Sequence, residues 1–216
     1  MFKRIKGTLI GGNFSYFITK DKKYFIKICK GELEWITKEF NNLLNYKDKV
    51  KVKNFKLVEP VKYSEEKEYL ITKFIDGKRL IEIYDPKIHF KFGKALKEFH
   101  EKGFSHSHFE LTDIIYKNGV FNIVDVPFFN EKPYIHDLVT IQMCFDIFKI
   151  KEPWNFYKYN RCSKEFFRGY QLNNYEEFEK EYKKSFEARV RLWMRKGKKD
   201  WIKGVIMKTY YKLGII

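Results

Sequence analysis

The sequence predicts a two-lobed α+β protein, in which a small antiparallel-β lobe with one helix is followed by a mainly helical lobe. The first third of the chain alternates apolar and polar residues in short runs that end at Gly, Asn, Asp or Lys, a pattern typical of strands and tight turns. The remainder carries apolar residues at helical spacing over several long segments. A chain of 216 residues, 44% of them hydrophobic, can bury the core of one large domain or of two small lobes.

The first lobe is expected to span residues 1–75. Apolar and polar residues alternate over 8–28, and Gly11-Gly12-Asn13 and the charged residues 20–23 interrupt the alternation, which predicts two or three antiparallel strands. A helical stripe and two further alternating runs follow, and Asp76-Gly77 predicts a closing turn. The remaining elements expected in this lobe are a helix over 31–46 and strands over 55–61 and 68–75.

The second lobe, residues 76–216, is expected to be helical except around Asn118-Gly119. This dipeptide separates two short apolar runs, which is a strong local signal for a β-hairpin. In the basic tail, residues 176–216, one stripe of apolar residues is expected to be buried: Phe178, Tyr182, Phe186, Val190 and Met194. The expected helices are 88–101, 135–148, 164–169, 176–195 and 201–213.

Composition excludes several classes of protein. A chain with 41 aromatic residues among its 216 can bury enough apolar surface to offset the entropy of folding, so disorder is excluded. No run approaches the roughly 18 apolar residues of a membrane-spanning helix, and Lys6 interrupts any secretory signal. Three widely spaced cysteines, Cys29, Cys144 and Cys162, predict reduced thiols in a cytoplasmic protein.

The chain has 44 Lys and Arg against 28 Asp and Glu, a net charge of +16. Such a charge is typical of proteins that meet an anionic partner, although only 7 of the basic residues are Arg and a Lys-rich composition also follows from an AT-rich genome. Half of the net charge lies in the last 28 residues, which contain nine basic residues and one acidic residue, Asp200. We therefore expect a basic surface in the C-terminal helices.

Lys27 lies on an apolar strand pattern over 24–28. A lone Lys on such a strand usually faces solvent. The glycines Gly11 and Gly12 upstream give it a second interpretation, because their backbone amides could approach phosphate oxygens that Lys27 also reaches. Glu39, in the following helix, is either a solvated carboxylate or the ion-pair partner that orients Lys27.

Residues 96–125 carry the most informative pattern. They resemble the small atypical branch of the protein-kinase-like superfamily, which includes lipopolysaccharide-core sugar kinases, aminoglycoside and choline phosphotransferases, and the small kinase of the threonylcarbamoyl-tRNA complex. That branch has a helix ending in LH..G, then HGDL....N, a hairpin and IDF. The matching segments are Leu96 with His100 and Gly103, then His106–Asp113, then Ile123–Asp125. Residues 135–138 resemble a later Asp-Leu that braces the catalytic loop, and 70–77 resemble the inter-lobe hinge.

The resemblance implies a set of site residues. Gly11, Gly12 and Lys27 would hold the phosphates of ATP, and Glu39 would orient Lys27. Magnesium would be bound by Asp125, with Asp113 at the second metal position, and Lys73 and Ile75 would lie at the hinge. The catalytic-loop region would span 104–129, with His108 at the position of the catalytic base. The histidines are not expected to form a zinc site, because His100 and His106 match structural positions of the family.

Several positions depart from the family pattern. His108 replaces the catalytic Asp, and Asp113 replaces the metal-binding Asn. A neutral imidazole can accept the hydrogen bond of an acceptor hydroxyl, and Glu110 is a further candidate base. The same replacement is also what a pseudokinase would show. Lys73 replaces the hinge Glu, and Val126 and Pro127 replace the Phe and Gly after the metal-binding Asp.

The resemblance thus implies an ATP- and magnesium-dependent phosphotransferase that acts on a hydroxyl of a sugar, a lipid-linked sugar or another small acceptor, similar to the lipopolysaccharide-core kinases. A catalytically impaired pseudokinase that binds nucleotide or a partner is the alternative, and a kinase like that of tRNA modification is a third option. We expect a cytoplasmic protein, or one peripheral to the inner face of a membrane through its basic helices. Nucleic acid is the less favoured partner.

Overall fold

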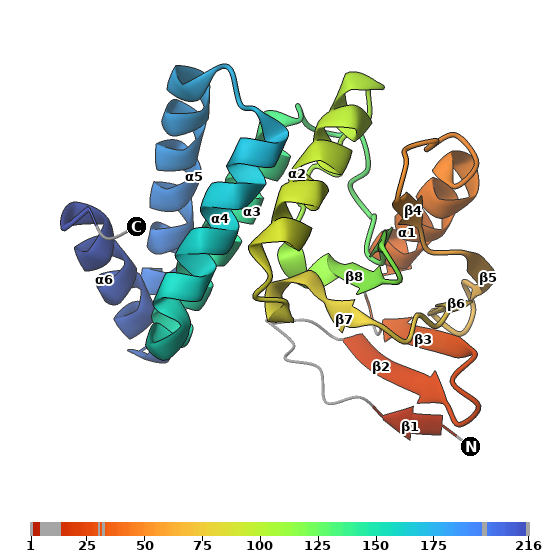
Figure 1. Ribbon diagram of the computed structural model, residues 1–216. Helices are drawn as coiled ribbons and strands as arrows, with labels where there is room; N and C mark the ends of the chain where they lie inside the picture. Colours follow the sequence, from red (N-terminus) through yellow and green to blue (C-terminus); the bar gives the residue numbers. More distant parts are fainter. Residues whose placement is uncertain (1, 5–13, 30, 32, 196–197, 215–216) are drawn as a thin grey trace. The chain divides into compact units, whose positions relative to one another are not determined.

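The computed structural model describes residues 2–4, 14–29, 31, 33–195 and 198–214 (Figure 1). Two compact units account for its contacts, and each is described by itself. Unit 1 comprises Met1–Ile83, Glu98–Ser107 and Thr112–Lys132, and unit 2 comprises Tyr84–Lys97, His108–Leu111 and Pro133–Ile216. Because the units interleave along the chain, the boundary expected after residue 75 stays a prediction.

Unit 1 contains a five-stranded antiparallel sheet in the order β1-β2-β3-β6-β5 (Figure 1). Helix α1, Leu33–Tyr46, accompanies this sheet and confirms the helix expected over 31–46. The sequence interpretation missed the short first strand. The strands are β1 (Phe2–Arg4), β2 (Phe14–Thr19), β3 (Tyr24–Cys29), β5 (Pro60–Ser64) and β6 (Tyr69–Lys73).

A second, four-stranded sheet of unit 1 has the order β4-β9-β8-β7, and its β4 and β9 run parallel. Its strands are β4 (Phe55–Leu57), β7 (Lys78–Arg79), β8 (Ile114–Lys117) and β9 (Val120–Ile123). The expected hairpin is confirmed as β8 and β9. Asn118 and Gly119 have φ values of 49° and 83°, and two consecutive left-handed residues give the primed turn that matches the twist of a hairpin.

The single strand expected over 55–61 is wrong, because the chain changes sheets within it. The amide of Val58 donates to the carbonyl of Ile123 at 2.9 Å, which continues the pairing of β4 with β9. One residue later, the carbonyl of Glu59 accepts from the amide of Lys73 at 2.9 Å and starts the pairing of β5 with β6. A run of residues with high strand propensity predicts extended backbone, but it does not predict the strand with which each residue pairs.

Unit 2 is helical apart from its loops. Helix α2 has its first three turns in unit 2 and its last residues in unit 1. The helices are α2 (Pro86–Glu101), α3 (Ile135–Lys151), α4 (Phe156–Tyr170), α5 (Tyr175–Arg195) and α6 (Lys198–Lys212). Three 3₁₀ turns lie between elements of the chain: η1 (Leu80–Glu82), η2 (Leu111–Asp113) and η3 (Pro153–Asn155). No helix among the described residues is both long and apolar enough to cross a bilayer.

Helix α4 begins eight residues before the position that the sequence predicts. Its core face uses Tyr159, Cys162, Ser163 and Phe166, which are buried at helical spacing. This stripe mixes polar and apolar residue types, so it does not show the aliphatic periodicity that predicts a helix in a sequence. Two glycines let α2 and α4 approach closely: a Cβ at Gly93 would lie 2.2 Å from the carbonyl oxygen of Phe166. The second glycine of the contact is Gly169.

The α5 stripe predicted in the sequence is buried over most of its length. Tyr182, Phe186 and Val190 form a core cluster with residues of α3 and α6, and Phe178 packs against it. The prediction is wrong for Met194, which is 37% exposed. Its neighbour on α6 is Gly204, which has no side chain to cover it.

Candidate functional site

Lys27 occupies the centre of the five-stranded sheet. In β3 it pairs with Tyr16 of β2 and Leu70 of β6, and only 7% of its surface is exposed. Its ammonium nitrogen lies 2.7 Å from Glu39 Oε2 and 3.0 Å from Asp125 Oδ1. The ion pair with Glu39 predicted from the sequence is therefore present, and Asp125 extends it to a group of three charges.

Glu39 reaches Lys27 because α1 turns one face to the core. Ile36, three residues earlier, and Leu43, four residues later, are fully buried on the same face. This spacing places the Glu39 carboxylate beneath the sheet with 1% of the residue exposed. The amphipathic pattern of the helix thus determines which of its carboxylates is buried.

The three charges shift one another's protonation. Burial lowers the pKa of Lys27, but the carboxylates of Asp125 and Glu39 outweigh burial and hold that pKa above its ordinary value. Complete burial raises the pKa of Glu39 from 4.5 to about 7, against the attraction of Lys27. Because this pKa is higher in the folded than in the unfolded protein, the stability that Glu39 contributes is complete below pH 4.5 and is lost as the pH rises to about 7.

Asp113 and Asp125 flank one end of the β8–β9 hairpin. Asp113 directly precedes β8, and Asp125 is the second residue after the end of β9. The residue between β9 and Asp125 is Val124, and its amide donates to the carbonyl of Asp113 at 3.0 Å. Burial raises the pKa of the Tyr16 hydroxyl on β2, Lys27 lowers it, and the carboxylates of Asp125, Glu39 and Asp113 add to the rise. The hairpin predicted from Asn118-Gly119 therefore brings together two acids that are twelve residues apart.

Two side chains hold the backbone around Asp125. His106 is buried, and its Nε2 donates to the carbonyl of Asp125. Asn42 Nδ2 donates to the carbonyl of Val126 at 2.8 Å and to that of Pro127 at 3.3 Å. The sequence interpretation missed Asn42. Its spacing of three residues from Glu39 was a usable signal, because it places both side chains on one face of α1.

The loop before His108 is tied to residues 130–132. Ser105 Oγ donates to the carbonyl of Lys132 at 2.6 Å, and Ser107 Oγ accepts from the amide of Lys132 at 2.8 Å. Ser107 has a φ of 70°, the left-handed region that glycine prefers. A serine whose hydroxyl is hydrogen-bonded thus adopts this conformation at the position where the family pattern described above has Gly.

His108 and Glu110 both fall in unit 2 and lie beside each other, with 3.6 Å between His108 Nε2 and Glu110 Oε1. The His108 side chain is 47% exposed. An exposed imidazole next to a carboxylate can accept a proton from a ligand hydroxyl. Either residue therefore stays a candidate base.

The remaining predicted positions have other surroundings. Lys73 ends β6 at the surface, where its ammonium lies 2.6 Å from Glu59 Oε2. Ile75 is half-buried, and its carbonyl accepts from the amide of Gly77 at 3.0 Å. Gly11 and Gly12 lie outside the described residues. Neither hinge residue is contradicted, and their contact with a nucleotide stays a prediction.

The chemistry of unit 1 fits a magnesium nucleotide. Asp113 and Asp125 offer hard oxygen ligands, and Lys27 offers a buried positive charge. Within the described part of the chain, no three His, Cys, Asp or Glu side chains form a complete metal site. Magnesium commonly takes one or two carboxylates from the protein and the rest of its ligands from phosphate and water, which is the complement these residues provide.

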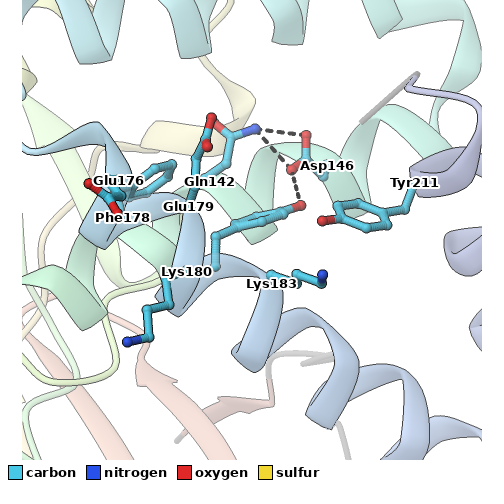
Figure 2. A pocket seen from close by; sticks show the side chains of 9 residues that line it. Gln142, Asp146, Glu176, Phe178, Glu179, Lys180, Lys183 and Tyr211 are labelled. Atoms are coloured by element: carbon cyan, nitrogen blue, oxygen red, sulfur yellow. Dashed lines mark hydrogen bonds between the residues drawn. The ribbon is translucent and has the colours of Figure 1, made fainter.

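Unit 2 contains a separate cavity of about 590 Å³ lined by residues of α3, α5 and α6 (Figure 2). Among the lining residues, the buried carboxylate of Asp146 accepts hydrogen bonds from Gln142 Nε2 at 2.9 Å and from the Tyr182 hydroxyl at 2.7 Å. The ammonium of Lys149, itself buried, lies 2.9 Å from the same carboxylate. The sequence interpretation missed this network, although Asp146 and Lys149 lie among apolar residues in the second half of α3.

We expect Tyr182→Phe to lower the free energy of unfolding by about 1 kcal/mol, because it removes the hydroxyl that donates a hydrogen bond to the buried carboxylate of Asp146. Urea unfolding measured by circular dichroism checks this value. Tyr175→Phe is the matched control, since it makes the same change at an exposed position of the same helix. Equal destabilisation by the two variants would show that the hydrogen bond to Asp146 does not support the fold.

The fold has known counterparts among solved structures. No protein-family model matches the chain, and no curated protein sequence does. An amicoumacin kinase in complex with AMP-PNP, Ca²⁺ and amicoumacin has a TM-score of 0.67 and 8% identity over 97% of this chain and 87% of its own. A gentamicin complex of the phosphotransferase APH(2″)-IIa has a TM-score of 0.63 and 13% identity over 96% of this chain and 90% of its own.

A third solved structure extends the comparison to a further phosphotransferase. The phosphotransferase APH(3″)-Id from Streptomyces rimosus has a TM-score of 0.62 and 10% identity over 84% of this chain and 90% of its own. These similarities cover nearly the whole of both chains, whereas the identities are low, so they establish the fold alone. The resemblance read from the sequence is confirmed at that level: the chain has the protein-kinase-like fold of the small-molecule phosphotransferases.

Proposed function

We propose that the protein transfers the γ-phosphate of magnesium ATP to a hydroxyl of a small acceptor. The observation that carries the proposal is the group formed by Lys27, Glu39 and Asp125, in which a buried ammonium lies within 3.0 Å of carboxylates from a helix and from the end of a hairpin. The fold supports it, because solved structures with this fold include phosphotransferases with ATP, ADP or AMP-PNP bound.

Each residue would have a distinct role. Lys27 would neutralise the α- and β-phosphates, and Glu39 would keep its ammonium in place. Asp125, with a side chain 40% exposed, would bind magnesium together with Asp113. A bound magnesium ion would neutralise charge on the transferring phosphate. His108 would accept the hydrogen bond of the acceptor hydroxyl, take up its proton as the new P–O bond forms and the bond to ADP breaks, and return it to solvent.

For the acceptor we propose a sugar or a sugar-like polyol, including a lipid-linked sugar of the kind that lipopolysaccharide-core kinases modify. Neighbouring structures are named for complexes with gentamicin, streptomycin and spectinomycin. A lipid-linked acceptor would bring the protein to an anionic membrane surface, and the basic helices α5 and α6 would then make the contact. In this proposal the protein works in the cytoplasm or at the inner face of the membrane.

The test combines nucleotide binding with turnover. We expect the wild type to bind magnesium ATP by calorimetry and to release ADP when an acceptor from a panel of aminoglycosides and core oligosaccharides is present. His108→Ala should keep the binding and lower turnover at least about 100-fold, because it removes the group that takes up the proton. His100→Ala, which changes a histidine that matches a structural position, is the control.

The replacement of an acid by His108 favours a second candidate, a nucleotide-binding pseudokinase. Binding of magnesium ATP by the wild type with no turnover on any acceptor would support this candidate and reject the transferase. Absence of binding would reject both.

A further inference from the structure

The outer side of helix α6 is apolar although it faces away from the core. The inner side of the helix packs on α5: Met207 joins the buried cluster, and the ring of Tyr211 stacks on Phe186 with 4.6 Å between centroids. Gly204, on the same side, lies against Val190 and Met194 of α5. One side of α6 is thus fully used in the fold of unit 2.

The other side carries large aliphatic side chains. A helix advances about 100° per residue, so Ile202, Ile206 and Leu213 lie opposite Met207 and Tyr211. They are 46%, 36% and 67% exposed, and the amide of Leu213 still donates to the carbonyl of Thr209, which continues the helical geometry. We call Ile202, Ile206 and Leu213 the outer stripe.

Positive charges border the outer stripe on both sides. Lys212 flanks the stripe on one side and Lys203 on the other, and both are exposed. Lys208, also exposed, lies further round the helix beyond Lys212, and Trp201, 47% exposed, lies between these two lysines. The segment 201–214 contains no Asp or Glu. A long lysine side chain at the border of an apolar surface can lay its aliphatic part along that surface and still place its ammonium group in a polar environment.

We propose that the outer stripe of α6 docks on an anionic lipid bilayer, with its aliphatic side chains in the boundary between headgroups and acyl chains, with Lys203 and Lys212 on lipid phosphates, and with Lys208 adding to the attraction from further round the helix. Aliphatic residues flanked by lysines, with a tryptophan at the border, are typical of helices that lie in a membrane interface. This proposal specifies the face and the mode of the membrane contact named above. It does not depend on phosphoryl transfer, because vesicle binding needs no nucleotide.

Charge and residue type favour lipid over the other occupants. Two copies of α6 packed stripe to stripe would bring their bordering lysines together without an acidic residue of the segment between them. Nucleic acid offers phosphates, but the bases it exposes are recognised by aromatic or arginine side chains rather than by Ile and Leu. A bilayer offers phosphates and an apolar layer at adjacent depths, which matches the arrangement on α6.

Sedimentation with vesicles tests the proposal. We expect the full chain to bind vesicles of 30% phosphatidylserine in phosphatidylcholine and to bind pure phosphatidylcholine more weakly. The variant I202S/I206S/L213S should lose at least about tenfold in affinity for the anionic vesicles, because burial of three aliphatic side chains is removed. Replacing Lys203, Lys208 and Lys212 by Gln should also lower the affinity at least about tenfold, and added salt should reproduce this loss.

The control variant W154S/Y157S removes two exposed aromatic residues, 77% and 70% exposed, from η3 and α4 and should bind as the wild type does. Vesicles that contain brominated lipid should quench the fluorescence of Trp201. This contribution is identified as the part of the tryptophan fluorescence that is absent from the variant Trp201→Phe. Three outcomes would each overturn the proposal: no binding to anionic vesicles at low salt, full binding by I202S/I206S/L213S, or a dimer that this variant converts to monomer without any change in vesicle binding. Circular dichroism of each variant excludes unfolding as the cause.

Discussion

Lys27→Met is expected to abolish detectable binding of magnesium ATP and to lower turnover at least about 100-fold. The substitution removes the ammonium group that lies within 3.0 Å of both Glu39 and Asp125. A buried positive charge that contacts phosphate contributes strongly, because the surrounding protein screens it less than water does. Calorimetric titration with magnesium ATP, followed by an ADP-release assay, measures both effects.

The folded state should survive this substitution. Lys27 lowers the pKa of Glu39, whereas burial and Asp125 raise it, so removal of Lys27 raises this pKa further above about 7. Glu39 can then take up a proton at neutral pH rather than remain a buried unpaired charge. The variant should therefore lose stability progressively between pH 4.5 and this higher pKa. At pH 6, before that loss is complete, a melting curve separates a binding defect from unfolding.

Lys23→Met is the matched control, because it makes the same change directly before β3 on a side chain that is 70% exposed. It should bind magnesium ATP as the wild type does. If Lys27→Met, folded at pH 6, kept wild-type affinity, the assignment of Lys27 to the phosphates would be wrong, and the ion-pair group would be a structural feature of the sheet.

Local patterns in the sequence accounted for much of this site. The helical spacing predicted α1 and left Glu39 either solvated or paired with Lys27, and the strand pattern placed Lys27 on β3. The turn residues Asn118 and Gly119 fixed the hairpin that brings Asp113 and Asp125 to one end. In each case the deciding interaction is between residues close in sequence, so propensity and periodicity are sufficient.

The parts that the sequence interpretation missed depend on contacts between distant residues. Asp125 joins Lys27 across 98 positions, and Asn42 reaches Val126 across 84. The parallel pairing of β4 with β9 is likewise non-local, which is why the change of sheets after Val58 was not predicted. Such pairings are selected by the whole core. A local pattern can show which helix face a residue such as Asn42 occupies, but it does not show which distant residue becomes its partner.

The network around Asp146 was missed for a different reason. A charged residue in a predicted helix is assigned to solvent by default, because most such residues are exposed. Here Lys149 and Tyr182 compensate for the burial of Asp146, and Tyr182 comes from another helix. Only the packing of α3 against α5 brings these groups together.

Asp125→Asn is expected to lower the affinity for ATP about 10- to 100-fold in magnesium and to leave it unchanged in EDTA. The amide is a poor ligand for a hard cation in place of a carboxylate, whereas it keeps the shape of the side chain and can still accept from Lys27. If the loss of ATP affinity appears only in the presence of magnesium, the substitution has removed a metal ligand and has not damaged the phosphate site. Asp48→Asn, at an exposed position after α1, is the control and should bind as the wild type does.

A second readout follows from the protonation of Glu39. The Asp125 carboxylate raises the pKa of Glu39, so its removal should lower that pKa from about 7 toward 4.5. Since the stability contributed by Glu39 is lost between these two pH values, the decrease in the free energy of unfolding from pH 4.5 to 7 should be smaller in Asp125→Asn than in the wild type. Equal affinities in magnesium would reject Asp125 as a metal ligand. Equal slopes with pH would show in addition that Asp125 and Glu39 are not coupled through Lys27, and the three charges would then have to be treated as two independent pairs.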